Sequence, residues 1–246
     1  MPLSYGRTWD DMVALFRSHI ELLLAIAGVF LFLPSLLTQL AVPDPQITGQ
    51  GIEALQQYLA HYQTYMPTMF LLSIPTALGQ ASILALVLDP ARPTVGMAIQ
   101  RGVSLLISFI ALNMLVNLSV MGGVLFFILP GIYLIGRTFA ASPALVAEHR
   151  LNPLTGFRRG LEVTRGNGWR VFGILLIIIL VGIILSAAIT SVLGVAISLL
   201  ASAETAIFAS AFVSAVLDSF IALALVLLAA AIYRQLSAVQ VSSNGM

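Results

Sequence analysis

The 35 residues from 102 to 136 read GVSLLISFIALNMLVNLSVMGGVLFFILPGIYLIG and contain no charged side chain. As one α-helix this stretch would measure about 52 Å, whereas the hydrocarbon core of a bilayer is about 30 Å thick. We therefore expect the stretch to fold back and to form two membrane-spanning helices. The residues that mark the expected turn are Asn117, Ser119, Gly122 and Gly123.

The whole chain has the same apolar character. Of its 246 residues, 59% are hydrophobic and 9% are charged, and the mean hydropathy is +1.03. A soluble domain usually has about 25% charged residues. The composition therefore excludes a soluble globular protein, a disordered chain and a nucleic-acid-binding protein. The sequence has no cysteine, which excludes disulfides, thiol nucleophiles and cysteine-based metal sites.

Six apolar segments predict an all-α fold, a polytopic membrane helical bundle with amphipathic surface helices. We expect a single membrane domain over residues 1–246. The six transmembrane helices are expected at about residues 20–42, 66–88, 102–118, 123–147, 171–200 and 205–233.

The arginines predict the orientation of the chain in the membrane. All 11 basic residues are arginine, and ten of them lie in alternate segments between the expected spans. The exception is Arg137, which lies inside the fourth span. Because positively charged loops stay in the cytoplasm, we expect both termini and the two arginine-bearing loops to be cytoplasmic.

Two of these cytoplasmic segments have the spacing of amphipathic surface helices. In the first, Thr8 is the expected N-cap. In the second, Asn152 is the expected N-cap, Pro153 fits the first helical position, and residues 166–168 (Gly-Asn-Gly) form a left-handed stop. The expected apolar stripe of the second helix consists of Leu154, Phe157 and Leu161. Gly156 and Gly160 have helix-packing spacing, but their position in a basic loop makes this a weak indication.

The second surface helix and its flanks carry candidate headgroup contacts. These are Arg158, Arg159, Arg165 and Arg170. One interpretation is topological anchoring, in which each arginine meets anionic headgroups and contributes about 1 kcal/mol. The alternative is a specific lipid-headgroup or partner site at Arg158 and Arg159.

Polar residues within the expected spans form a candidate intramembrane site, which consists of Arg137, Asp218, Asn113, Asn117 and Ser214. An ionisable side chain at mid-membrane is energetically costly, so it usually has a polar partner or a functional role. Depth along the fourth and sixth spans predicts an ion pair between Arg137 and Asp218. In the alternative, Arg137 extends to the inner headgroups and Asp218 stays protonated against Ser214. Asp218 is then a candidate proton or substrate relay.

The sequence contains no catalytic signature. The three histidines, His19, His61 and His149, lack metal-ligand spacing, and no G-x-S-x-G nucleophile motif occurs. We therefore expect no enzyme activity and no catalytic, cofactor-binding or metal-binding residues.

One stretch between residues 129 and 173 resembles a known family. It contains the segments 130–133 (PGIY), 142–145 (SPAL) and 157–160 (FRRG), then 164–170 (TRGNGWR), together with Arg137. These segments resemble the YciC-like family of bacterial six-span inner-membrane proteins. They also look like the membrane domain attached to some glycerophosphodiester phosphodiesterases. The resemblance implies a protein of the bacterial inner membrane, and it supplies no catalytic residues.

Two functions are compatible with the sequence. The first is non-enzymatic maintenance of the envelope or its lipids through contacts with membrane lipids or with other inner-membrane proteins. The alternative is a small transporter or lipid-handling protein with a polar interior around Asp218, Asn113 and Arg137. A water-filled cavity that reaches Asp218 would favour transport, whereas a dry core with basic surface helices would favour the first function.

Overall fold

The computed structural model describes residues 3–91, 93–200 and 202–244, and within these ranges the chain is all-α and has no strand. The expected fold class is confirmed. In chain order the helices are α1 (Tyr5–Ser18), α2 (Ile20–Ala27), the π-helix η1 (Gly28–Phe32), α3 (Leu33–Ala41), α4 (Ile52–Leu88), α5 (Val95–Phe126), α6 (Ile128–Thr138), α7 (Ala141–Ala147), α8 (Pro153–Val163), α9 (Gly168–Leu200) and α10 (Ala203–Asn244).

Six segments of the described chain are long and apolar enough to cross a membrane. They are Ile20–Ala41, Ile52–Leu88, Val95–Phe126, Ile128–Ala147, Gly168–Val195 and Thr205–Ala238. The protein is thus a multi-pass membrane protein by helix length and composition. The fourth segment differs from the others, because it consists of two short helices, α6 and α7, with a break at Phe139 and Ala140.

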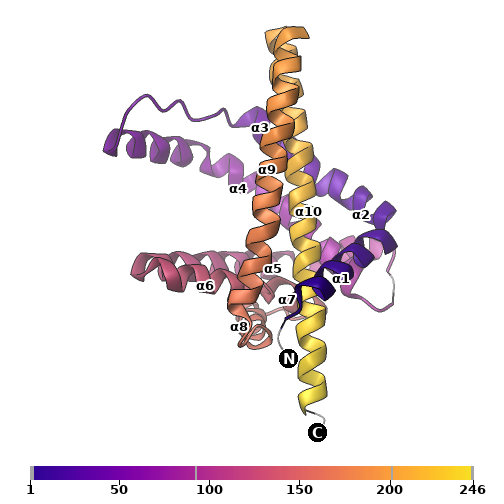
Figure 1. Ribbon diagram of the computed structural model, residues 1–246. Helices are drawn as coiled ribbons and strands as arrows, with labels where there is room; N and C mark the ends of the chain where they lie inside the picture. The colour runs from indigo at the N-terminus through magenta and orange to yellow at the C-terminus, as the bar shows by residue number, and fades with distance from the viewer. Residues whose placement is uncertain (1–2, 92, 201, 245–246) are drawn as a thin grey trace.

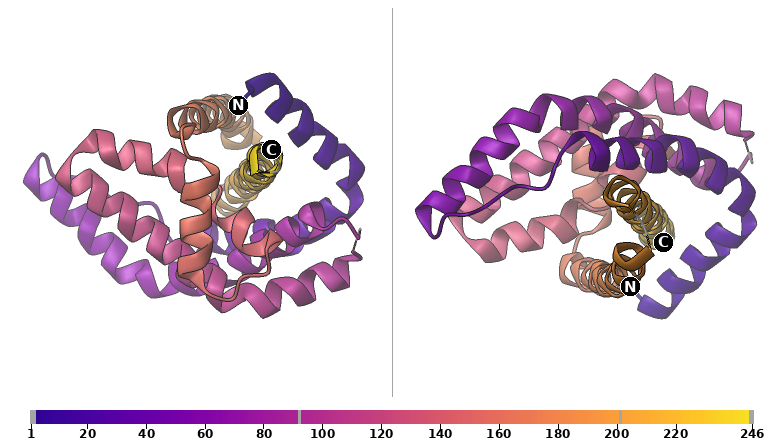
Figure 2. Two further views of the ribbon diagram at one scale, coloured as in Figure 1. Left: turned by 90° about the horizontal axis from the view of Figure 1, so that it is seen from below. Right: turned by 90° about the horizontal axis from the view of Figure 1, so that it is seen from above.

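The helices do not all run in one direction. Figure 1 shows α9 and α10 as a long vertical pair, whereas α4, α5 and α6 extend sideways across them. Figure 2, from below and from above, shows α9 and α10 end-on and the other long helices lying in the plane of the view. The molecule therefore has two lateral arms, one formed by the N-terminal part of α4 with the loop before it and the other by α5 and α6.

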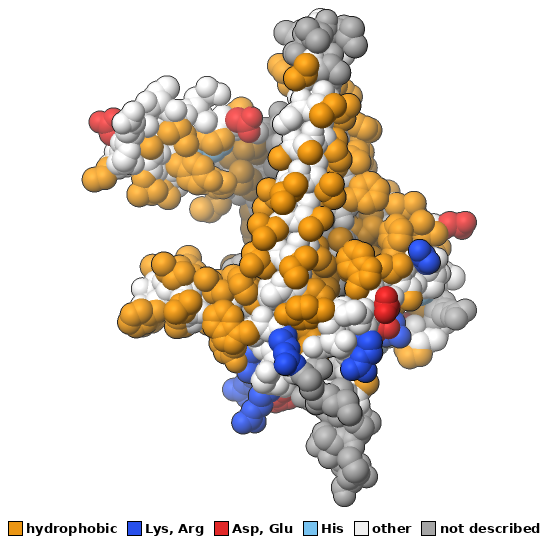
Figure 3. All heavy atoms as spheres, viewed as in Figure 1, with side chains coloured by type: hydrophobic (Ala, Val, Ile, Leu, Met, Phe, Trp, Pro, Cys, Tyr) orange, Lys and Arg blue, Asp and Glu red, His pale blue; other side chains and the backbone are white. Residues whose placement is uncertain are grey.

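The core lies where the C-terminal half of α4, the short α7 and the C-terminal half of α10 meet. Leu86, Leu145 and Ile232 are almost completely buried there. Away from this core the helices expose apolar side chains, which cover both arms and the α9–α10 pair in Figure 3. In the same view the arginines gather towards the lower end of the molecule. Arg92 belongs to the expected arginine pattern but lies outside the described residues.

The turn after α5 is not where the sequence predicted it. α5 continues through Asn117, Ser119 and Gly123 to Phe126, and the chain reverses at Phe127. The hydroxyl of Ser119 donates to the Leu115 carbonyl of its own helix at 2.7 Å, so this polar group does not require a turn. Gly123 allows α5 and α6 to approach each other closely, because a Cβ atom there would lie 2.9 Å from the Cα atom of Gly131.

The N-cap of the first surface helix is also corrected. α1 begins at Tyr5 after the cap residue Ser4, and Thr8 lies inside the helix and is fully buried. Its hydroxyl bonds the Ser4 carbonyl at 2.9 Å and the Gln235 Oε1 atom at 2.8 Å. The threonine thus fixes α1 to the C-terminal part of α10, a role that local spacing does not reveal.

Candidate functional site

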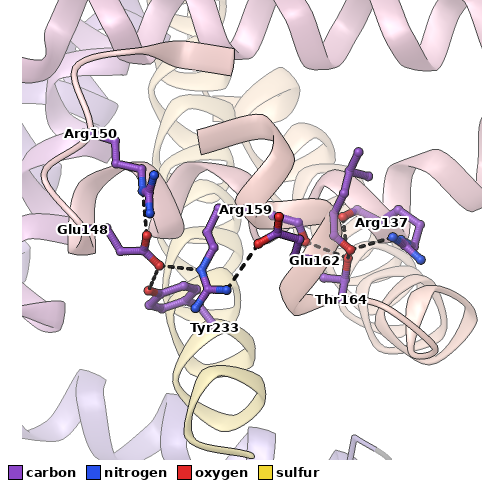
Figure 4. A network of polar contacts seen from close by, with 9 residues as sticks. Arg137, Glu148, Arg150, Arg159, Glu162, Thr164 and Tyr233 are labelled. Atoms are coloured by element: carbon purple, nitrogen blue, oxygen red, sulfur yellow. Dashed lines mark hydrogen bonds and ion pairs between the residues drawn. The ribbon is translucent and has the colours of Figure 1, made fainter. Parts of the chain in front are cut away.

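A polar network on the arginine-bearing side of the molecule centres on Glu148, directly after α7. Its Oε2 atom lies 2.6 Å from Nε of Arg150, and its Oε1 atom lies 2.7 Å from Nε of Arg159 in α8. The hydroxyl of Tyr233 in α10 donates to the same Oε1 atom at 3.1 Å. Figure 4 shows that the network continues from Arg159 to Glu162, at 3.4 Å. One carboxylate therefore joins α7, α8 and α10.

The surroundings of Glu148 favour its charged form. Burial alone would raise the pKa of this carboxyl, but hydrogen bonds from Arg159, Arg150 and Tyr233 outweigh burial and lower the pKa below its ordinary value. The hydrogen bond to Glu148 in turn raises the pKa of Arg159. Glu148 is thus ionised at neutral pH and holds α8 in place electrostatically.

The predicted second surface helix is confirmed as α8, with the predicted start and stop. The Asn152 side chain accepts a hydrogen bond from the Leu154 N–H at 2.9 Å, Pro153 is the first helical residue, and Gly166 has φ +77°. Residues 166–168 thus provide the expected left-handed stop before α9.

The predicted apolar stripe of α8 is buried only in part, because Phe157 packs against the core and Leu161 is half-buried. Leu154 is exposed, whereas Gly156 and Gly160 are buried against α7. A Cβ atom on Gly156 would lie 2.9 Å from Cβ of Leu145. The four-residue spacing of Gly156 and Gly160 therefore does indicate a helix–helix contact, because small residues let the backbones of α8 and α7 approach closely.

The four candidate headgroup arginines separate into two groups. Arg158, Arg165 and Arg170 are exposed and have no ion pair within the described part of the chain. Arg159 is half-buried and bonded to Glu148, so it serves internal packing. Glu148 was not among the predicted site residues: Arg150, two residues downstream, is a local signal for an ion pair, whereas Arg159 lies 11 residues downstream in another helix.

Arg137 lies at the junction of α6, α8 and the start of α9. Its Nη2 atom donates to the Leu161 carbonyl at 2.5 Å, and its guanidinium carbon lies 5.8 Å from the centre of the Tyr133 ring. The Arg137 carbonyl accepts the Thr164 hydroxyl at 2.7 Å. Gly168 leaves the room for this arrangement, because a Cβ atom there would lie 2.8 Å from Cδ of Arg137. Arg137 therefore belongs to the same polar layer as α8, as Figure 4 shows.

Asp218 lies in α10 and has different partners. Its Oδ2 atom accepts hydrogen bonds from Ser35 at 3.3 Å and from Gln39 at 3.1 Å, both in α3. The predicted ion pair between Arg137 and Asp218 is therefore wrong. Equal depth brings two residues together only when their helices cross the membrane in parallel, whereas α6 is short and runs across α10.

A cavity of about 320 Å³ reaches Asp218. It lies between α3, α4 and α10, and its polar lining residues are Ser35, Thr38, Gln39, Ser73, Thr76, Asp218 and Ser219. The cavity contains one acidic group surrounded by neutral hydroxyl and amide groups. This arrangement can hold a hydrated cation or a polar group that donates hydrogen bonds.

A second cavity of about 450 Å³ contains two of the predicted polar residues, Asn113 and Asn117 of α5. Its other polar lining residues are Gln80 of α4, Thr138 and Ser142, and its apolar lining includes Ala222. Ala222 also borders the first cavity, so the two cavities meet α10 at the same residue. Ser214 borders neither cavity.

The structure thus divides the predicted intramembrane site into three places: the Arg137 junction, the Asp218 cavity and the Asn113–Asn117 cavity. Among the described residues, no group of three or more His, Asp or Glu side chains could hold a metal ion. Comparisons with protein-family models, with curated proteins and with solved structures find no match for this chain. The YciC-like resemblance therefore stays a prediction.

Proposed function

We propose that this protein is a non-enzymatic membrane protein that binds the polar part of a membrane lipid in the Asn113–Asn117 cavity. The observation that carries the proposal is this cavity itself, which combines amide groups with an apolar wall inside a set of membrane-length helices. Its volume of about 450 Å³ is within the usual range of small-molecule sites.

The amides in this cavity have unused hydrogen-bonding capacity. Asn113 donates to the Phe109 carbonyl of its own helix at 3.0 Å, whereas the side chains of Asn117 and Gln80 have no hydrogen bond to a described residue. An amide without a partner in an apolar environment is unfavourable by a few kcal/mol. A lipid hydroxyl, ester or phosphate group would provide the missing partners.

Lipid has a lateral route to the cavity. The lining residues come from α4 on one arm, from α5 and α6 on the other, and from α7 and α10 between them. Figure 3 shows an open cleft between the two arms. Acyl chains in this cleft would contact apolar side chains on both arms. The exposed Arg158, Arg165 and Arg170 provide additional headgroup contacts on the arginine-bearing side.

The same proposal includes the cellular location. Arginine placement supports a bacterial inner-membrane protein with both termini in the cytoplasm, and contacts with membrane lipids or other inner-membrane proteins would serve envelope maintenance.

Native mass spectrometry of the purified protein tests lipid binding. After delipidation, phosphatidylglycerol and phosphatidylethanolamine are added back to the wild type and to the double variant Asn113→Leu, Asn117→Leu. We expect the double variant to bind roughly 10-fold or more weakly, because two hydrogen bonds of about 1 kcal/mol each are lost. The matched control is Ser119→Leu on the same helix, since Ser119 does not border the cavity. Equal binding by all three proteins would refute the proposal.

A second candidate function, small-solute or proton transport, is favoured by the cavity that reaches Asp218. Proteoliposomes with an internal pH dye test it directly. A proton flux that Asp218→Asn abolishes would support transport, and no flux above protein-free liposomes would exclude proton transport.

A further inference from the structure

The tip of the α5–α6 hairpin consists entirely of apolar side chains. The six residues of the tip are 44–82% exposed: Val124, Leu125, Phe126, Phe127, Ile128 and Leu129. A turn that connects two membrane-crossing helices and lies in water normally carries polar residues. Exposure of six large apolar side chains to water would be unfavourable at about 25 cal/mol for each Å². The composition of the tip therefore favours hydrocarbon as its surroundings.

The backbone of this turn is suited to an apolar medium. The Phe127 N–H donates to the Gly123 carbonyl at 3.0 Å, and the Gly131 N–H donates to the Phe127 carbonyl at 3.4 Å. Pro130 has no N–H group and so removes one of the donors that a helix start leaves without a partner. Only Phe127 interrupts the two helices, which keeps the number of unsatisfied polar groups in hydrocarbon small.

The base of the hairpin is fixed in the charged layer of the protein, by which we mean the level of α8 with Arg158, Arg159 and Glu162. The Arg137 carbonyl bonds Thr164 and the Arg137 guanidinium bonds Leu161, so the end of α6 lies directly against α8. α8 carries the exposed Arg158 and the ion-paired Arg159 and Glu162, which exclude it from hydrocarbon. We therefore place the membrane surface on the arginine-bearing side at the level of the Arg137 Cα atom.

The length of α6 then limits the depth of the tip. Ten residues separate Phe127 from Arg137, and a helix rises 1.5 Å per residue, so the tip lies at most about 15 Å below the surface. The hydrocarbon core is about 30 Å thick. The hairpin tip therefore lies no deeper than the middle of the bilayer. By contrast, α9 extends over 33 residues and is long enough to cross completely.

The course of α5 agrees with this limit. Arg101 near its start forms an ion pair with Asp89, and Ser108 in its middle donates to the Leu151 carbonyl of the α7–α8 loop at 2.5 Å. The first half of α5 therefore runs along the charged layer instead of leaving it. Figure 1 shows the same relation, because α5 and α6 extend across the direction of α9 and α10.

We infer that α5 and α6 form a re-entrant hairpin, which enters the bilayer from the arginine-bearing side and turns back among the acyl chains of that leaflet. The hairpin is thus a hydrophobic wedge whose partner is lipid hydrocarbon. The arginine pattern is compatible with this arrangement, since both ends of a re-entrant hairpin lie on the same side. The inference does not depend on lipid binding in the Asn113–Asn117 cavity.

The absence of cysteine allows a direct test by single-cysteine labelling of the full chain. A membrane-impermeant maleimide is added to spheroplasts and to inverted membrane vesicles that contain Phe126→Cys. We expect no labelling of Phe126→Cys from either side and complete labelling after denaturation in sodium dodecyl sulfate, which shows that the cysteine is reactive once the hydrocarbon is removed. The matched controls are Gln50→Cys and Arg158→Cys, which should react from opposite sides.

Two outcomes would overturn the re-entrant arrangement. Labelling of Phe126→Cys from the Gln50 side would show a complete crossing, and labelling from the Arg158 side would place the hairpin outside the hydrocarbon. If Phe126→Cys does not accumulate, Leu125→Cys provides the same test, since its side chain is 79% exposed. A bimane label at either position should be quenched more strongly by lipids brominated within the acyl chain than by lipids brominated near the headgroup. Stronger quenching by bromine near the headgroup would contradict the predicted depth.

Discussion

Gly160 of α8 lies so close to Ala141 of α7 that a Cβ atom at position 160 would be 2.6 Å from the Ala141 Cα atom. Three backbone and side-chain atoms of Ala141 lie within 2.7 Å of that position. Because two helix backbones cannot move apart without loss of their other contacts, this approach fixes the distance between the surface helix and the core.

The first prediction is that Gly160→Ala destabilises the protein by about 1–3 kcal/mol, as overpacked sites do. Thermal unfolding in detergent micelles measures the change. The control is Gly122→Ala in α5, where no atom lies within 4 Å of an added Cβ. This variant should be neutral or stabilised by up to about 1 kcal/mol, because alanine favours helix. Equal losses in both variants would contradict the close contact between α7 and α8.

The second prediction concerns Glu148 and pH. Because the pKa of Glu148 is lowered in the folded protein, its carboxylate adds stability above the ordinary glutamate pKa of about 4.3. This contribution disappears as the pH falls through the lower pKa of the folded state. Glu148→Gln should therefore destabilise the protein by roughly 1–3 kcal/mol at pH 7, and the difference from wild type should shrink below about pH 4.

The control for this pH dependence is Asp44→Asn, since Asp44 is exposed and has no ion pair with a described residue. Its unfolding temperature should follow the wild type from pH 7 to about pH 3. A constant difference between Glu148→Gln and wild type over this range would show that the charge of Glu148 does not stabilise the fold.

A double-mutant cycle tests the bond between Glu148 and Tyr233. Tyr233→Phe removes the hydroxyl that lies 3.1 Å from Glu148 and should reduce the free energy of unfolding by about 1 kcal/mol. In the Glu148→Gln background the same change should have a smaller effect, with a coupling energy of at least about 0.5 kcal/mol. Additive losses would mean that α10 is not held to α7 through this hydroxyl.

The fourth prediction follows from the separate partners of Arg137 and Asp218. Since they contact different groups, the losses from Arg137→Gln and Asp218→Asn should add within about 0.5 kcal/mol in the double variant. Asp218→Asn and Gln39→Leu should not be additive, because these side chains bond each other at 3.1 Å. Recovery of stability in the Arg137–Asp218 double variant would instead support an ion pair between them.

Local sequence signals predicted much of the fold. Long uncharged runs identified the six apolar segments, and the positions of Asn152, Pro153 and Gly166 defined α8 and its end. These signals act within one turn or one helix, where spacing determines geometry. These signals did not predict the apolar turn at Phe127. The polar Ser119 before it forms a hydrogen bond within α5, and Gly123 packs against α6, so neither residue marks a turn.

The long-range partners were less accessible from sequence. Depth along a helix predicts which residues meet only when the helices run in parallel, and α6 and α10 do not. The same reason explains why Asn113 and Asn117 were placed with Asp218 in one site although they line a separate cavity. Glu148 was missed because it lies in a loop, where no periodicity connects it to Arg159 or Tyr233.

Ala222 borders both intramembrane cavities, and it is the residue that their two linings share. Its size therefore affects the volume of both cavities. A larger side chain at this position would narrow both spaces at once, and a smaller one would widen both. The two cavities therefore cannot vary independently through residue 222 during evolution. A substitution there that improves the fit of one occupant changes the room for the other, so this position constrains how far either cavity can specialise.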